Sequence, residues 1–289
     1  MKFILVSLLV GFSFLTFSQN KPAYVIYNAK GKKVSYKKML QAAIASDITF
    51  FGEFHDNTIA HWLELELTMD MARLTNNQLT LGFEMFEQDQ QQLLSDYQSG
   101  KITAKQFEDS TRLWNNYKTD YKPIVNFAKD NNLICVASNI PRWIASLVYK
   151  KGRVALDSLK PIDYNHMCDK NYVVDTSLSQ YKKMLGMMPD HNKGLNFIYS
   201  QASKDATMAH FIDKYWKNYP TNKFIHFNGS FHTDFDQGII WYLKRLRPNL
   251  HYTTITVVEQ SDFKKMDKEH IDKAHFIICV DEHMTKTIH

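Results

Sequence analysis

The stretch "ITFFGEFHD", residues 48–56, places an apolar run directly before Gly, Glu, His and Asp. Its first four residues are β-branched or aromatic and lack helical spacing, so they predict a short buried strand. Glu53, His55 and Asp56 then fall at the end of that strand, where open α/β sheets bind their ligands. The alternative is an ordinary loop in which Asp56 or Asn57 caps the next helix.

The same strand-and-tip pattern recurs along the chain. Further apolar runs are "QLTLGFEMF" (78–86), "LICVASNIPR" (133–142), "NKFIHFNGSFHTDF" (222–235), "HYTTITVVEQ" (251–260) and "AHFIICVD" (274–281), with "YVIY" (24–27) preceding them. Strands that alternate with helical segments predict an α/β fold with a mostly parallel central sheet flanked by helices. Two long helical insertions, residues 88–131 and 142–217, are expected to form a lobe over the C-terminal edge of the strands.

The N-terminus does not belong to this predicted domain. "MKFILVSLLVGFSFLTFSQ" combines the basic Lys2 with an apolar stretch and small residues near Ser18. This pattern predicts a secretory signal peptide over residues 1–18, cleaved near Ser18, and thus an exported protein in the periplasm or outside the cell. An uncleaved anchor is the alternative, although the run is short for a membrane span. Residues 19–289 are then expected to form a single domain.

Composition excludes several classes of function. The net charge of +5 is small, the basic residues are scattered, and no RNA- or DNA-reading motif is present, so nucleic acid is not an expected partner. Three cysteines form no disulfide framework, and Cys135 and Cys279 lie in apolar runs typical of a core. The sequence also lacks a P-loop, a dinucleotide-binding glycine motif and the serine-nucleophile elbow.

Two strand tips share the form Gly-x-x-His and end in His55 and His232. Because parallel strands bring their ends to one edge, these histidines can meet a carboxylate from Glu53 or Glu84. Two imidazoles and one carboxylate suit a divalent transition metal, and three ligands leave a position open for metal-assisted hydrolysis. Glu53 and Glu84 are both candidates for a catalytic role, with one completing the metal site and the other acting as general base.

Other polar residues near the tips each have more than one interpretation. His61, one turn inside the next helix, is a further ligand, a donor to a ligand or an ordinary helix-start histidine. Arg142 follows a strand tip, so it is expected either to bind a ligand carboxylate or to form a salt bridge. Asn139 is a ligand-binding candidate and also a predicted N-cap, with Pro141 in the first helical turn.

Five motifs together resemble a known family. They are "GEFHDN" (52–57) with His61, "GFEMFEQDQQ" (82–91), "ASNIPR" (137–142), "SQASKDATMAHFI" (200–212) and "GSFHTDFDQGI" (229–239). In this order they are similar to the ChaN-like haem-binding uptake family, which belongs with the Tiki proteases and the erythromycin-esterase-like proteins. The resemblance runs from about residue 40 to residue 282. Ser230 and Phe231 depart from it, since many relatives have Gly or Asn before the last histidine.

The resemblance implies two functions. The ChaN-like branch implies a haem-binding protein of haem or iron acquisition, with haem or another small molecule as ligand, a homodimer, and an outer-membrane uptake receptor as partner. The wider superfamily implies a metal-dependent hydrolase, a protease or an esterase, so enzymatic activity stays open and a divalent metal is the alternative cofactor. Asp205, on a predicted helix, is expected either to orient a metal-bound histidine, as the resemblance implies, or to be a surface charge. Asp56 and His61 are further candidates for such a supporting role.

Haem needs axial ligands and a flat apolar slot. The inserted stretch "QYKKMLGMMPDHNKG", residues 180–194, supplies candidates for haem contact: Tyr181, Met184, Met188 and His191. The alternative for the methionines is plain apolar packing within the lobe. Arg142 is expected to pair with a haem propionate.

Overall fold

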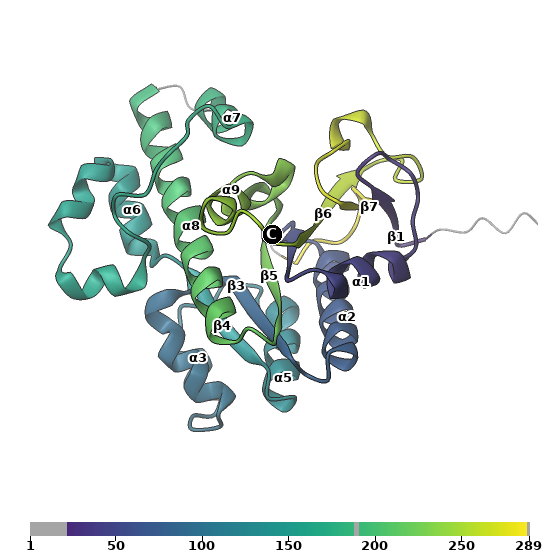
Figure 1. Cartoon of the computed structure of the whole chain (residues 1–289), viewed down its shortest axis with the longest axis horizontal. Coiled ribbons are helices and arrows are strands. Elements are labelled where there is room, and N and C mark those ends of the chain that lie inside the picture. Colours follow the sequence, from purple (N-terminus) through teal and green to yellow (C-terminus); the bar gives the residue numbers. More distant parts are fainter. Residues whose placement is uncertain (1–21, 188–190, 288–289) are drawn as a thin grey trace, which may run out of the picture.

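The computed structural model describes residues 22–187 and 191–287. Within these residues one seven-stranded sheet has the order β1-β7-β6-β2-β5-β3-β4 (Figure 1). Its neighbouring strands are parallel except for β1 and β7. The predicted α/β fold with a mostly parallel sheet is thus confirmed. The strands are β1 (Tyr24–Asn28), β2 (Ile48–Glu53), β3 (Leu79–Glu87), β4 (Ile134–Asn139), β5 (Lys223–Gly229), β6 (Tyr252–Gln260) and β7 (Phe276–Asp281).

Strand β2 occupies the middle of the sheet and is buried along its whole length. It pairs with β6 on one side and with β5 on the other, and in this register Glu53 lies opposite Gly229. Strand β3 follows on the other side of β5, with Phe83 opposite Phe227. The polar tips of β2, β5 and β3 are therefore adjacent at one edge of the sheet.

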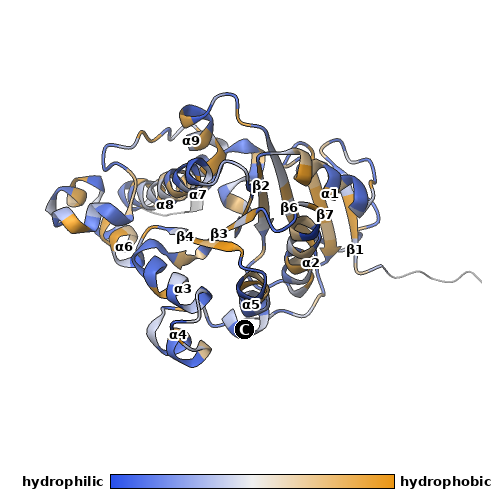
Figure 2. Ribbon diagram, turned by 60° about the horizontal axis from the view of Figure 1, so that its bottom comes forward, coloured by the Kyte–Doolittle hydropathy of each residue, from blue (hydrophilic) through white to orange (hydrophobic). Residues whose placement is uncertain are grey.

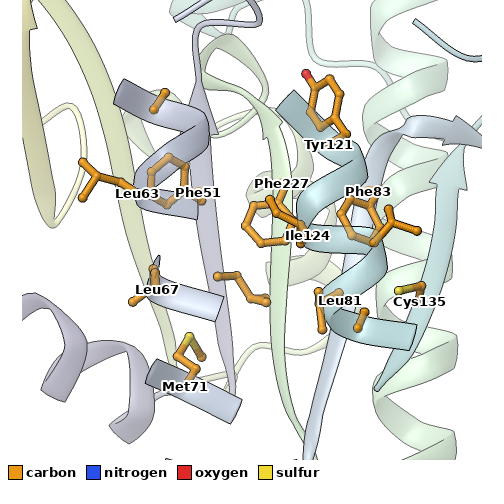
Figure 3. Close-up of a cluster of buried hydrophobic side chains, with 14 of the residues drawn as sticks. Phe51, Leu63, Leu67, Met71, Leu81, Phe83, Tyr121, Ile124, Cys135 and Phe227 are labelled. Atoms are coloured by element: carbon orange, nitrogen blue, oxygen red, sulfur yellow. The ribbon is translucent and has the colours of Figure 1, made fainter. Parts of the chain in front are cut away.

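Helices cover both faces of the sheet and leave its hydrophobic strands at the centre (Figure 2). One core contains Phe51, Leu67 and Ile124 (Figure 3), and the other contains Phe50, Ile144 and Ile212. Helices α1 (Tyr36–Ala45), α2 (Thr58–Leu74), α3 (Gln91–Gln98), α4 (Ala104–Ser110) and α5 (Lys122–Asp130) supply the first, and α6 (Arg142–Lys151), α7 (Ser179–Met187), α8 (His191–Asn218) and α9 (Ile239–Leu246) the second.

The two insertions therefore pack on opposite faces of the sheet. Residues 88–131 contribute α3 and α5 to the first core, and residues 142–217 contribute α6 and α8 to the second. No helix among the described residues is long and apolar enough to span a membrane. The predicted signal peptide lies outside the described residues.

After β7 the chain turns back toward the loop that follows β2. We call residues 284–287 the C-terminal tail. The backbone N–H of Thr287 donates to the carbonyl of Asp56 at 3.0 Å, and Asn57 forms a bridge with Lys286. Lys286 also pairs with Glu259 of β6. The tail thereby fixes the loop that connects β2 to α2.

Candidate functional site

Glu84, on β3, lies at the centre of the strand tips. Its buried carboxylate accepts the backbone N–H of Gly229 at 2.8 Å and lies 3.2 Å from Nε2 of His232. Burial opposes ionisation, but His232 and His55 hold the pKa of Glu84 well below its usual range. The carboxylate is therefore a fixed negative charge between the two histidine-bearing tips.

The glycines of both Gly-x-x-His motifs are required by close packing. A Cβ on Gly229 would lie 2.9 Å from Nε2 of His55 and 3.7 Å from Oε2 of Glu84. A Cβ on Gly52 would lie 2.9 Å from the Cα of Ser230. The two contacts of 2.9 Å are shorter than side-chain carbons tolerate, so glycine at both positions lets the imidazole of His55 and the loop at Ser230 pack closely. The structure thus brings His55, Glu84 and His232 together.

His232 is held from its other side by a buried carboxylate. Its Nδ1 lies 2.5 Å from Oδ1 of Asp205 on α8, and the hydroxyl of Tyr181 donates to Oδ2 of Asp205 at 2.7 Å. Burial lowers the pKa of His232, but the charges of Glu84 and Asp205 outweigh burial and raise it to about 10. Asp205 therefore holds the ring of His232, and Ser230 and Phe231 do not disturb this contact. Its role beside a bound metal stays a prediction.

Of the two histidines in the Gly-x-x-His motifs, His55 is the one that faces the solvent. Its side chain is 40% exposed, its Nδ1 lies 2.7 Å from Oε1 of Glu53, and its ring meets Trp114 edge-on at 4.6 Å. Burial lowers its pKa, while Glu53 and Glu84 raise it above the ordinary value. His55 lines a cavity of about 390 Å³ together with Glu84, Leu113, Trp114, Asn115, Arg142 and Lys204. We call this cavity the tip pocket, and His55, Glu84, His232 and Asp205 the tip cluster.

A second group of titratable side chains lies behind His55. His61 and Glu64, both on α2, approach Glu53: Nδ1 of His61 is 2.9 Å from Oε2 of Glu64 and 3.3 Å from Oε2 of Glu53. On the other side of the ring, Nε2 of His61 lies 3.5 Å from Oδ2 of Asp120. All four side chains are buried. We call Glu53, His61, Glu64 and Asp120 the rear cluster.

Charge is unevenly shared within the rear cluster. Burial disfavours the charged form of Glu53, but His61 and His55 lower its pKa to about 2. Burial and the charge of Glu53 raise the pKa of Glu64 well above its usual value. Burial also opposes the charge of His61, yet Glu53 and Glu64 raise its pKa to about 10. His61 is therefore a protonated imidazole among carboxyl groups.

The sequence analysis named Glu53 and His61 of the rear cluster as site candidates but not Glu64 or Asp120. Asp120, Asn116 and Tyr121 lie in or beside a short π-helical turn, Tyr117–Tyr121, whose return to β2 no local pattern indicates. The Nδ2 of Asn116 donates to the carbonyl of His55 and to Asp120, each at 2.6 Å. Among the residues that were missed, Glu64 was predictable from the sequence, because a glutamate three positions after His61 lies on the same face of a helix.

The structure confirms one predicted helix cap and contradicts another. Asn57, one of the two predicted caps, caps α2 by accepting the N–H groups of Ile59 and Ala60, whereas Asp56 contacts Lys286 of the tail. The prediction that Asn139 is an N-cap is wrong. Strand β4 continues through Asn139, and its side chain donates to the carbonyl of Glu84 at 2.9 Å.

The helix that follows β4 begins at Arg142, with Pro141 as its N-cap rather than in its first turn. The side chain of Arg142 is 72% exposed at the tip pocket and lies 3.7 Å from Glu87. It is therefore available to a ligand that enters from the solvent.

The haem-contact candidates differ in where they lie. Tyr181 and Met184 are buried in the second core, and the hydroxyl of Tyr181 already donates a hydrogen bond to Asp205. Met188 and the side chain of His191 lie outside the described residues. Neither Tyr181 nor Met184 is among the described residues that line the tip pocket, and the contact of all four candidates with haem stays a prediction.

Comparison with known families decides the relationship. The family described as "Haem-binding uptake, Tiki superfamily, ChaN" matches residues 39–243, which is more than half of the chain. The chain belongs to this ChaN family. The predicted resemblance is therefore confirmed, and it covers the tips of β2, β3, β4 and β5. No curated protein sequence matches the chain significantly.

Solved structures agree with the fold of this ChaN-family protein. ChaN of Campylobacter jejuni, described with cofacial haem binding, is 17% identical with a TM-score of 0.67, and the match covers 89% of this chain and 97% of that one. A Bacillus cereus protein is 10% identical with a TM-score of 0.54, covering 92% and 96%. The erythromycin esterase EreC is 11% identical with a TM-score of 0.47, covering 82% and 77%, which is too distant to support an argument.

Proposed function

We propose that this protein binds haem at the mouth of the tip pocket. The observation that carries the proposal is the half-exposed imidazole of His55, which lines the pocket beside two cationic side chains, Arg142 and Lys204. Membership of a haem-binding uptake family supports the same ligand.

The residues of the pocket fit the parts of a haem molecule. Because Nδ1 of His55 is bonded to Glu53, Nε2 is the nitrogen left for the iron, and a carboxylate partner of this kind raises the basicity of a ligating imidazole. Arg142 and Lys204 supply positive charge for the two propionates. Trp114, packed edge-on against His55, offers an apolar contact for the porphyrin.

We further propose that the protein is exported and serves haem or iron acquisition. The N-terminal pattern of a signal peptide supports export, and the family supports the role in uptake. The pocket is open to solvent, so a haem bound there keeps one face exposed. That exposed face suits a second copy of the chain in a homodimer, or transfer to an outer-membrane receptor.

A haem titration followed by Soret absorbance tests the binding. We expect saturation at one haem per chain for the wild type, loss of the ligated spectrum in His55→Ala, and weaker binding in Lys204→Gln because a propionate partner is removed. Lys214→Gln is the matched control, since Lys214 lies on the same helix but lines a different cavity. Tyr181→Phe and His191→Ala test two of the remaining candidates for the axial ligand. Absence of binding at micromolar haem would reject the proposal.

A metal-dependent hydrolase is the second candidate function. It is favoured by the convergence of His55, Glu84 and His232, with Asp205 bonded to the far nitrogen of His232 as in metal sites. In this alternative Glu84 and the two histidines hold the metal, and Glu53 is the candidate base. Metal analysis of the wild type, His55→Ala and His232→Ala tests it, together with ester and peptide hydrolysis. Equal metal content in all three proteins would exclude this site.

A further inference from the structure

We propose that the rear cluster is a separate binding site for a divalent transition-metal ion, with Glu53, His61 and Glu64 as its ligands. One donor atom from each residue lies within 4.8 Å of the other two, and all three side chains are buried. The three residues can share one ion without any rearrangement of the strand and helix that carry them. Its ligands include neither haem nor a histidine of the tip cluster, although Glu53 also contacts His55.

Two carboxylate oxygens in the cluster are not used by hydrogen bonds. Oε2 of Glu53 and Oε1 of Glu64 are buried and have no hydrogen-bond partner among the described residues, although Oε2 of Glu53 lies 3.3 Å from Nδ1 of His61. Burying such oxygens without a donor or a cation is costly. Oε1 of Glu53 is already used, since Tyr121 donates to it at 2.5 Å and His55 lies 2.7 Å away. Oε2 is consequently the oxygen left for an ion.

The surroundings of His61 match those of a metal-bound histidine. Its Nε2 lies 3.1 Å from the carbonyl oxygen of His55 and 3.5 Å from Asp120, so both acceptors favour a proton on that nitrogen. The opposite nitrogen, Nδ1, faces Glu53 and Glu64 and carries a proton in the metal-free protein. A bound ion would displace that proton and take the lone pair of Nδ1. Ligating histidines are usually oriented in this way by a carbonyl or carboxylate on the far side. Asn116 holds Asp120 in place.

The donor set selects the kind of ion. One imidazole nitrogen with carboxylate oxygens suits Mn²⁺, Fe²⁺ or Zn²⁺. Ca²⁺ prefers six to eight oxygen ligands, more than these three residues provide. The competing explanation is a single proton shared between Glu53 and Glu64, which would satisfy the same two oxygens without any metal.

Metal loading separates these explanations. Protein stripped with a chelator is titrated with Mn²⁺ and with Zn²⁺, and bound metal is measured by mass spectrometry. We expect about one ion in His232→Ala, which lacks a tip ligand, and at least about tenfold weaker binding in Glu64→Gln. Asp213→Asn is the matched control, because Asp213 is a buried carboxylate on α8 that pairs with Arg247 outside both clusters. Binding of neither metal by the wild type, or unchanged affinity in Glu64→Gln, would overturn the proposal in favour of the shared proton.

Crystals of wild-type protein soaked in Mn²⁺ provide a test that needs no variant. We expect an anomalous difference peak enclosed by Glu53, His61 and Glu64. A peak only between His55, Glu84 and His232 would reject the rear site and support the hydrolase alternative instead. The metal titration and the Mn²⁺ soak do not involve haem. Both can therefore be interpreted even if the protein fails to bind haem.

Discussion

The tip cluster and the rear cluster use the same residue types in opposite settings. The tip cluster places two histidines around Glu84 and Asp205 and opens onto a pocket lined by cations. The rear cluster surrounds one histidine with three carboxyl groups and is closed to solvent. Exposure, and not residue type, therefore determines which group can receive a large ligand.

Glu53 and His55 connect the two clusters. One oxygen of Glu53 contacts His55 and Tyr121, and its other oxygen faces His61. Figure 3 shows Tyr121 at the margin of the first core, with its hydroxyl turned away from the other labelled side chains. Strand β2 therefore carries a carboxylate that belongs to both clusters, and a change in one is expected to reach the other.

The largest effect is expected from His61→Ala. This change leaves Glu53, Glu64 and Asp120 buried around an empty space, and removing one partner of a buried ion pair costs about 3–5 kcal/mol. Urea unfolding of metal-free protein measures the loss. His55→Ala is the comparison, because His55 is partly exposed and should cost less. Equal losses in the two variants would show that burial does not distinguish the clusters.

A smaller loss is expected from Gly229→Ala. The added methyl group would collide with the imidazole of His55, and overpacking of this kind costs about 1–3 kcal/mol. His55 should be displaced from the tip pocket, so haem affinity should fall together with stability. Gly186→Ala is the control, since nothing lies within 4 Å of a Cβ at that position. Wild-type haem binding in Gly229→Ala would contradict the role of His55.

The smallest effect is expected from pH. The pKa of His232 is raised to about 10, so its proton stabilises the fold fully below the ordinary histidine range, and this stabilisation is lost as the pH rises toward 10. In the presence of a chelator, the wild type should lose about 1–2 kcal/mol more than His232→Gln between pH 6 and pH 8. Thermal unfolding at both pH values measures the difference. Parallel pH profiles would show that His232 is not charged in the fold.

The sequence predicted those features that depend on local patterns. The apolar runs predicted all seven strands, and their polar ends predicted which residues would lie near His55 and His232. Asp120 and its partner Asn116 were missed because they reach the rear cluster through a π-helical turn whose position depends on tertiary packing. Asn139 was wrongly predicted to be an N-cap because β4 extends through this residue. Its side-chain amide therefore donates across the sheet to the carbonyl of Glu84 on β3. The link between Asp205 and His232 came from the family resemblance alone.

The central position of β2 has a consequence for synthesis of the chain. Its two neighbours, β5 and β6, come from residues 223–260, so a nascent chain carries β2 with both edges unpaired until most of the protein has left the ribosome. Unpaired strand edges are prone to aggregate, and pairings between distant segments form slowly. The tip cluster cannot be complete on such a partial chain, because it includes His232, which follows β5. We therefore expect ligand binding at the tip cluster to begin only after synthesis is nearly complete, and truncated products to need chaperone protection.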